Sequence, residues 1–360
     1  MTVAAFMELA LYHPEIGYYA RAAQRSGRAG DFVTSVDVGP VFGELLEIQL
    51  AEMVALLAAD VPAAATVDIV EAAAGNGRLS ADILRAARRR DPAFYERIRL
   101  HLVEASAVAR AEQARVLGAE RERLASSSPD LPPSFMGVLL ANELLDALPV
   151  HQVVMRPGGL REVYVTASGG SLRTVEGPPS TPELAAYLDR LGVIIEPGWC
   201  GEINLRAIEW IRAAARSLSR GFIIIIDYGH EARELYSVRH AGGTLTTFMR
   251  HTQAGPERPA DAPAWLEEAG DRDITAHVDF TSVRMAAEAE GLTTLGFLDQ
   301  TYFLMGLGVA TLDTADLKRR LALKTLLIPG GLGSTHKVLI FGKGVGAPSL
   351  AGCSFRVRVT

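Results

Sequence analysis

The sequence predicts an α/β protein built on a mostly parallel sheet with helices on both faces. Strand-like and helix-like patterns alternate over most of the 360 residues, as the crossover connections of a parallel sheet require. Short, almost purely apolar runs at residues 66–70 (TVDIV), 135–140 and 221–226 are typical of strands buried on both faces. An apolar fraction of 49% is enough for a sizeable core.

The elements are expected in a definite order along the chain. Helices are predicted at 3–11 and 41–57, with a glycine-rich ordered loop between them. Further helices are predicted after Gly77, after the second strand up to Leu117, at 202–218 and at 279–291. Gly221 is expected to end the helix at 202–218. Strands are predicted at 66–70, 98–106, 135–143, 221–229, 292–298 and 335–344, with a hairpin at 151–165. Residues 168–182 are expected to form a connection and 229–270 an irregular insertion, while the last two strands are expected to form a closing pair.

These elements group into four regions. A helical N-terminal cap with the GDFVTS loop occupies 1–60, and the half of the sheet with the glycine turn occupies 61–150. A hairpin and helical insertion at 151–220 and the remaining strands at 221–360 complete the chain.

Composition and charge exclude several classes of protein. A net charge of −6 argues against general nucleic-acid binding, which needs a dominant basic surface. Apolar runs are too short to cross a bilayer and the first residues lack a signal-peptide pattern, so we expect no membrane association and a cytoplasmic location. Two distant cysteines and eight histidines without an HxxxH pair predict neither a disulfide framework nor a metal site.

A glycine turn joins the first buried strand to a helix in the stretch VDIVEAAAGNGRLSADIL. Gly75 and Gly77 would let backbone N–H groups approach an anion at the helix N-terminus. The dinucleotide fingerprint would place a third glycine where Ser80 stands. A tight turn without a ligand remains an alternative.

Two acidic residues bear on the ligand. Glu104 ends the second strand, where a carboxylate can accept the ribose hydroxyls of any adenosine cofactor. Glu71 lies beside the turn and would repel a pyrophosphate but favour the amine and sulfonium of S-adenosylmethionine, whose carboxylate the turn amides could receive. The alternative for Glu71 is a strand-end carboxylate that caps the following turn. A nicotinamide-dependent oxidoreductase is disfavoured by Glu71 and by the missing third glycine.

A second polar cluster follows the third buried strand. Asn142, Glu143 and Asp146 lie beyond its carboxyl end, where open α/β sheets bind their ligands. Such groups are costly to bury unless they are used or hydrogen-bonded. Helix capping by Asn142 with solvated carboxylates is the alternative.

Several blocks in order resemble the MidA-type S-adenosylmethionine-dependent methyltransferases over nearly the whole chain. The blocks are YHPEIGYY, GDFVTS with FGELL, the acidic residue with its glycine turn, ANELLDALPVHQ, IDYGH, GTL, DITAHVDFTSV, GFLDQTYFL and THKVLIFGK. Mitochondrial members of that family are complex I assembly factors that methylate an arginine of a core subunit. The resemblance implies a class I, Rossmann-like methyltransferase sheet with a helical N-terminal extension and an inserted substrate-side region.

The resemblance also implies roles for particular residues. Glu71, Gly75 and Gly77 would form the cofactor turn, and Glu104 would be the ribose acceptor. A loop with Asp31, Phe32 and Thr34 would close over the cofactor. The reaction centre would contain Asn142, Glu143 and Asp146. The chain departs from the family at Ala73 and Ala74, which replace a glycine and a proline, at Arg78, and at residues 36–40. Ala73 could crowd the cofactor unless its φ is negative.

The expected reaction is methyl transfer, for which orientation of the acceptor matters most. A guanidinium acceptor would need carboxylates to hold and polarise it, and Glu143 and Asp146 are the first choices. His277 is a second-line base or a structural histidine, and Asp227 and Tyr228 either shape the acceptor pocket or make strand-end hydrogen bonds. A protein arginine is the expected acceptor. Two alternatives stay open: a small-molecule hydroxyl or nitrogen as the acceptor, and a non-catalytic role in assembly. Self-association of the chain also stays open.

Overall fold

The computed structural model describes residues 1–20, 34–58, 65–249, 252–255, 262–309, 316–328 and 332–355. The chain forms two compact units, each assembled from three stretches. Unit 1 comprises Met1–Phe32, Leu145–Ile211 and Gly229–Ala286, and unit 2 comprises Val33–Leu144, Arg212–Tyr228 and Ala287–Thr360. The expected division near residue 150 lies close to the first return of the chain into unit 1, but the other expected regions are shared between the units.

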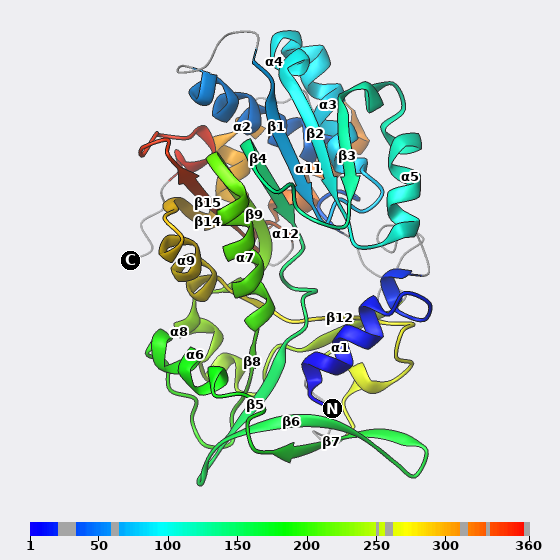
Figure 1. Cartoon of the computed structure of the whole chain (residues 1–360), viewed down its shortest axis with the longest axis vertical. Helices are drawn as coiled ribbons and strands as arrows, with labels where there is room; N and C mark the ends of the chain where they lie inside the picture. The colour runs from blue at the N-terminus through cyan, green and yellow to red at the C-terminus, as the bar shows by residue number, and fades with distance from the viewer. Residues whose placement is uncertain are drawn as a thin grey trace. The chain divides into compact units, whose positions relative to one another are not determined.

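Unit 2 is built on the predicted mostly parallel sheet, in the order β14-β15-β9-β4-β1-β2-β3 (Figure 1). The strands are β1 Val67–Ala72, β2 Ile98–Val103, β3 Leu124–Ser128, β4 Phe135–Asn142, β9 Leu218–His230, β14 Thr293–Asp299 and β15 His336–Lys343. All neighbouring pairs are parallel except those of β15, which runs antiparallel to both β9 and β14. The expected closing pair of strands is therefore confirmed.

Helices of unit 2 bury one face of this sheet. They are α2 Val41–Ala58, α3 Arg78–Arg90, α4 Pro92–Arg97, α5 Ala107–Leu117, α10 Gln300–Gly306, α11 Leu317–Leu327 and α12 Leu332–Thr335. Alternate strand residues such as Ile69, Leu140 and Ile224 join Phe42 and Leu46 of α2 in one apolar cluster. This follows from the strand period of two, which sends every second side chain to the same face.

Three consecutive arginines, residues 88–90, form the last turn of α3. Arg90 Nη1 lies 2.8 Å from Glu47 Oε2 of α2, and Arg89 Nη2 lies 3.2 Å from Glu44 Oε1. Cations in the last helical turn also interact favourably with the helix dipole. These arginines therefore bind α3 to α2.

Unit 1 contains two antiparallel sheets. The larger has the order β7-β6-β5-β8 and the smaller the order β11-β10-β12. Their strands are β5 His151–Arg156, β6 Gly159–Ser168, β7 Ser171–Gly177, β8 Cys200–Ile203, β10 Thr246–Met249, β11 Thr252–Ala254 and β12 Asp273–Thr275. Helices α1 Val3–Tyr12, α6 Glu183–Leu191 and α8 Ala232–Leu235 belong to this unit, and Phe6 of α1 packs on Trp265 at a ring distance of 5.6 Å. The predicted hairpin at 151–165 is confirmed as β5 and β6.

The chain passes from one unit to the other within two further helices and within β9. Helix α7 is Leu205–Ser217 and α9 is Phe280–Ala289. The last residues of β9 pair with β13, Val278–Asp279, inside unit 1. In the described part of the chain, no helix is both long and apolar enough to span a membrane.

Two local predictions were wrong, and one strand was not predicted. Gly221 does not end a helix; it lies inside β9, where a Cβ would come within 1.9 Å of the Gly137 carbonyl oxygen of β4. Part of the expected connection at 168–182 is strand β7, and the polar segment LASSS forms the edge strand β3. Both strands lie at sheet edges, where apolar patterning on two faces is not required.

Candidate active site

Polar residues from five strand ends of unit 2 meet at one edge of the sheet. Carboxyl ends of parallel strands share an edge, and the amino end of an antiparallel strand lies at the same edge. The glycine turn follows β1, Asn142 ends β4 and Glu143 follows it. Asp227 lies near the end of β9, Gln300 follows β14 and His336 begins β15. The chain runs outward from β1 to β2 and β3 and returns to β4 on the other side of β1, which is the switch point where such sheets bind ligands.

The turn after β1 adopts a left-handed backbone at three positions. Ala73, Gly75 and Gly77 have φ values of 55°, 51° and 83°. Nothing lies within 4 Å of the point where a Cβ of Gly75 would stand, so the backbone is open there to a close ligand. Ala73 takes a conformation that a side chain disfavours, in the place where the resembling family has glycine.

The amides of the turn are not the free anion donors that the sequence suggested. Gly75 N donates to Glu104 Oε2 at 2.8 Å, and Gly77 N donates to the Ala74 carbonyl at 2.8 Å. The other Glu104 oxygen accepts from Ser106 N at 2.7 Å. The structure thus brings Glu104 and Gly75 together, and the carboxylate braces the turn from the end of β2.

Glu71 adopts the capping geometry that was its alternative interpretation. Its side chain is 5% exposed, and Oε2 accepts from Ser80 N at 3.2 Å and from Ser80 Oγ, in the first turn of α3. Burial raises the pKa of Glu71 to about 8, despite the two Ser80 hydrogen bonds that lower it. The raised pKa weakens the argument from a fixed negative charge beside the turn.

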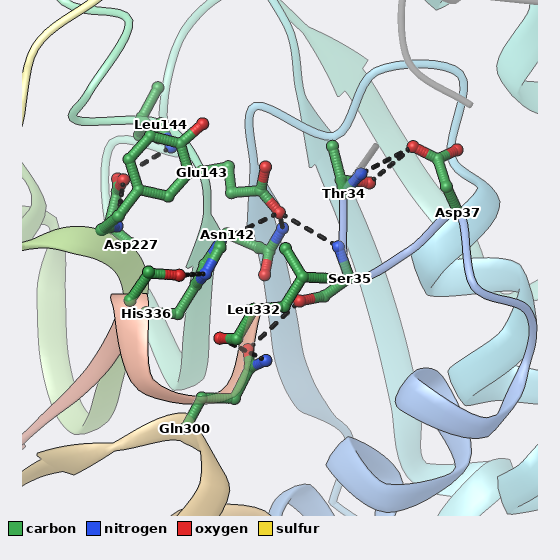
Figure 2. A network of polar contacts seen from close by, with 12 residues as sticks. Thr34, Ser35, Asp37, Asn142, Glu143, Leu144, Asp227, Gln300, Leu332 and His336 are labelled. Atoms are coloured by element: carbon green, nitrogen blue, oxygen red, sulfur yellow. Dashed lines mark hydrogen bonds and ion pairs between the residues drawn. The ribbon is translucent and has the colours of Figure 1, made fainter. Parts of the chain in front are cut away.

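Glu143 is the centre of a second group of contacts (Figure 2). Its backbone is left-handed, with φ 51°, and its N–H donates to Ile226 O of β9 at 2.8 Å. Oε1 accepts from Ser35 N at 3.3 Å and from Asn142 Nδ2 at 3.2 Å, and His336 Nε2 lies 3.7 Å away. The Glu143 side chain is 8% exposed. Such backbone strain costs about 1–3 kcal/mol and is typical of functional sites.

Two buried polar atoms beside Glu143 have no hydrogen-bond partner within the described residues. They are Asn142 Oδ1 and His336 Nε2. Buried polar atoms of this kind usually bind another group, because leaving them unsatisfied costs about 1–3 kcal/mol. Both atoms are available to polar groups of a ligand.

Asp227 supports the backbone around Glu143. It is fully buried, and its two oxygens accept from Leu144 N at 3.1 Å and from Tyr228 N at 2.9 Å. This is the strand-end hydrogen bonding that was one interpretation of Asp227. Asp227 therefore fixes the main chain just after β4 and near the end of β9.

The loop before α2 joins the two halves of the site. Thr34 N and Oγ1 both donate to Asp37 Oδ2 at 2.9 Å, and Arg78 of α3 pairs with the same carboxylate. Ser35 Oγ donates to Gln300 Oε1 at 3.2 Å. Asp37 and Arg78 are both departures from the resembling family, and the structure explains them as one ion pair.

The other predicted site residues fall elsewhere. Asp31 and Phe32 lie outside the described residues. Asp146 and His277 belong to unit 1, where Ala276 N donates to the Asp146 carbonyl at 3.0 Å. Burial and the neighbouring histidines lower the pKa of His277 to about 4, which is far from the pKa near working pH that suits a general base. Their catalytic roles stay predictions.

A family model described as S-adenosyl-L-methionine-dependent methyltransferase matches residues 45–298. The chain belongs to this family. It is 30% identical to mouse "Protein arginine methyltransferase NDUFAF7, mitochondrial", over 95% of this chain and 76% of that protein, and 30% identical to the human protein of that name, over 86% and 70%. A superfamily member from Burkholderia thailandensis, crystallised with S-adenosyl-homocysteine, superimposes with a TM-score of 0.86 at 29% identity, covering 98% of this chain and 90% of that one.

The protein is thus a methyltransferase that uses S-adenosylmethionine, as the sequence predicted, and its class I fold is confirmed. The residues present fit this cofactor. The open backbone at Gly75, the Glu104 carboxylate at the end of β2 and the unsatisfied Asn142 Oδ1 all lie at the switch-point edge of unit 2. An adenosine ribose needs such acceptors, and the cofactor supplies a methyl group carried on a sulfonium.

Three residues of the candidate site were not predicted from the sequence. Ser35, Gln300 and His336 lie within blocks that carry the family resemblance, namely GDFVTS, GFLDQTYFL and THKVLIFGK. Nothing in their local spacing marks them as site residues. They become recognisable only because Ser35 and His336 approach Glu143 from 108 and 193 positions away in the chain.

Proposed function

We propose that this methyltransferase transfers its methyl group to the guanidinium of an arginine in a protein. The proposal is supported by the relatives named as protein arginine methyltransferases and by the oxygen acceptors of Glu143 and Asn142. A guanidinium carries five N–H donors and no acceptor, so its binding site must offer oxygen atoms. Glu143 and Asn142 Oδ1 offer them side by side.

The observation that carries the proposal is the position of Glu143. The residue is held in a strained backbone conformation by its N–H bond to Ile226 O, and the Ser35 amide orients its carboxylate. An ionised carboxylate makes charge-assisted hydrogen bonds to a guanidinium and fixes its plane. Held in this way, the acceptor nitrogen is aligned, and alignment contributes most to an in-line displacement.

The residues of the β1 turn are proposed to bind the cofactor. Glu104 would accept the ribose hydroxyls, and the backbone at Gly75 and Gly77 would lie against the cofactor. Thr34 is proposed to support the loop above it through Asp37 rather than through direct contact, since both its N–H and hydroxyl are bonded to that carboxylate.

The test is transfer of label from S-adenosylmethionine to a protein extract low in arginine methylation, followed by acid hydrolysis and amino-acid analysis. Label should appear in methylarginine. The Glu143→Gln variant, which keeps the size of the side chain, should lower kcat/KM by about 10²-fold or more with cofactor affinity little changed. Glu120→Gln is the matched control, because Glu120 is an equally buried carboxylate of unit 2 bonded to Tyr95 instead.

Label confined to small molecules would overturn the arginine proposal while leaving the methyltransferase assignment intact. Full activity of Glu143→Gln on a protein acceptor would remove Glu143 from the mechanism.

A further inference from the structure

Three histidines of unit 1 come together from separate segments. His230 ends β9, His240 ends the short 3-10 helix Val238–His240, and His277 lies between β12 and β13. The ring of His230 lies 4.7 Å from that of His240 and 5.2 Å from that of His277, and the last two rings are 5.8 Å apart. Each residue offers one ring nitrogen within 4.8 Å of the other two.

The spacing is close to that of metal ligands. The centre of a triangle with sides of 4.8 Å lies about 2.8 Å from each corner. A Zn–N bond is about 2.1 Å long, so side-chain movements of about 0.7 Å would bring all three nitrogens to one ion. Side chains reach this through small rotations about χ1 and χ2.

Glu234 fixes the tautomer of one ring. His240 Nδ1 lies 3.1 Å from the Glu234 carbonyl oxygen. A carbonyl can only accept a hydrogen bond, so Nδ1 carries the proton and Nε2 of the neutral ring has a free lone pair. Metal-binding histidines are usually held in this way, with the second nitrogen donating to a carbonyl or carboxylate. The Glu234 carboxylate also lies 3.3 Å from His230 Nδ1.

The backbones that carry the other two rings are anchored. His230 pairs with Asp279 in the β9–β13 ladder, and His277 N donates to Thr244 Oγ1 at 3.1 Å. All three histidines are half-buried, so an ion can reach them from solvent.

We propose that His230, His240 and His277 form a binding site for one divalent transition-metal ion of the zinc class. Imidazole nitrogens suit Zn²⁺, and three of them leave a fourth position for water or for the Glu234 carboxylate. Methyl transfer does not use this ion. By joining the end of β9 to the short 3-10 helix that follows it and to the segment between β12 and β13, the ion stabilises unit 1.

The experiment uses the full chain, freed of metal by a chelator and titrated with Zn²⁺ or with Co²⁺ as a spectroscopic probe. One ion should bind per chain, and the bound Co²⁺ should show the intense visible bands of low coordination number. His240→Ala and His277→Ala should each weaken binding at least tenfold. His13→Ala is the matched control, because it removes a half-buried histidine of the same unit outside the cluster, and should bind as the wild type does.

Zinc should also raise the thermal unfolding midpoint of the wild type and of His13→Ala but not of His240→Ala. If the cluster variants fail to fold, X-ray absorption by the zinc-loaded wild type decides, since it must show three imidazole ligands. Absence of stoichiometric binding by the wild type, equal binding by His240→Ala and His13→Ala, or a zinc environment without imidazoles would overturn the proposal.

Discussion

Replacement of Ala73 by glycine should stabilise the protein, although glycine normally destabilises. Ala73 has φ 55°, a region that costs an L-residue about 1–2 kcal/mol. Glycine avoids that strain but loses about 0.5–1 kcal/mol through the greater freedom of the unfolded chain. Ala73 is half-buried, so loss of its methyl group removes a few tenths of a kcal/mol more. The net expectation is a gain of about 0.5 kcal/mol.

The neighbouring Ala74 provides the control. It does not have a positive φ and is 5% exposed, so Ala74→Gly loses both the entropy term and a buried methyl, about 1.5 kcal/mol in all. The two variants remove the same atoms one position apart, yet should differ by about 2 kcal/mol.

The assay is the urea midpoint of unfolding, read by circular dichroism with the slope of the transition compared among the three proteins. Ala73→Gly should unfold at higher urea than the wild type and Ala74→Gly at lower urea. If Ala73→Gly is destabilised as much as Ala74→Gly, the strain assigned to the cofactor turn is not present.

Three further predictions concern the same unit. Arg78→Ala and Asp37→Ala should show a coupling of about 1 kcal/mol in a double-mutant cycle of urea midpoints, because they form one ion pair; additive effects would contradict the pairing. The pKa of Glu71 is about 8, above its unfolded value near 4.5, so the stability that its protonated form contributes is complete below pH 4.5 and is lost as the pH rises through 8. Glu71→Gln retains an acceptor for Ser80 and should flatten this decline. The free energies of unfolding of the variant and the wild type are compared by urea titration at about pH 5 and 8. An unchanged dependence on pH would mean that Glu71 is ionised throughout this range. Glu104→Ala should weaken S-adenosyl-homocysteine binding at least tenfold by calorimetry, because it removes both the expected ribose acceptor and the brace on Gly75. The control Glu112→Ala, at a half-buried residue paired with Arg115, should leave binding unchanged. Equal affinities of the two variants would remove Glu104 from the cofactor site.

Much of the sheet was predictable because its signals are local. The apolar runs at β1, β4 and β9 and the helical spacing of α2 are patterns within a few residues, and each reports burial directly. The edge strands β3 and β7 were missed for the same reason, since a strand exposed on one side needs no apolar run. The ion pair of Arg78 and Asp37 shows the limit: both were visible as departures from the family, but only contact across 41 positions explains them.

The sequence by itself determined the mostly parallel sheet, the glycine turn at its switch point, the family and the methyl donor, because these depend on short patterns and on blocks kept in order. Only the tertiary structure decided that burial raises the pKa of Glu71, that Ser35 and His336 lie near Glu143, and that three histidines without any common spacing come together. The pKa of Glu71 depends on how completely water is excluded from it. Which distant side chains meet depends on which strand ends lie at the same end of the sheet. Both are properties of the folded chain, formed by residues that are far apart along it.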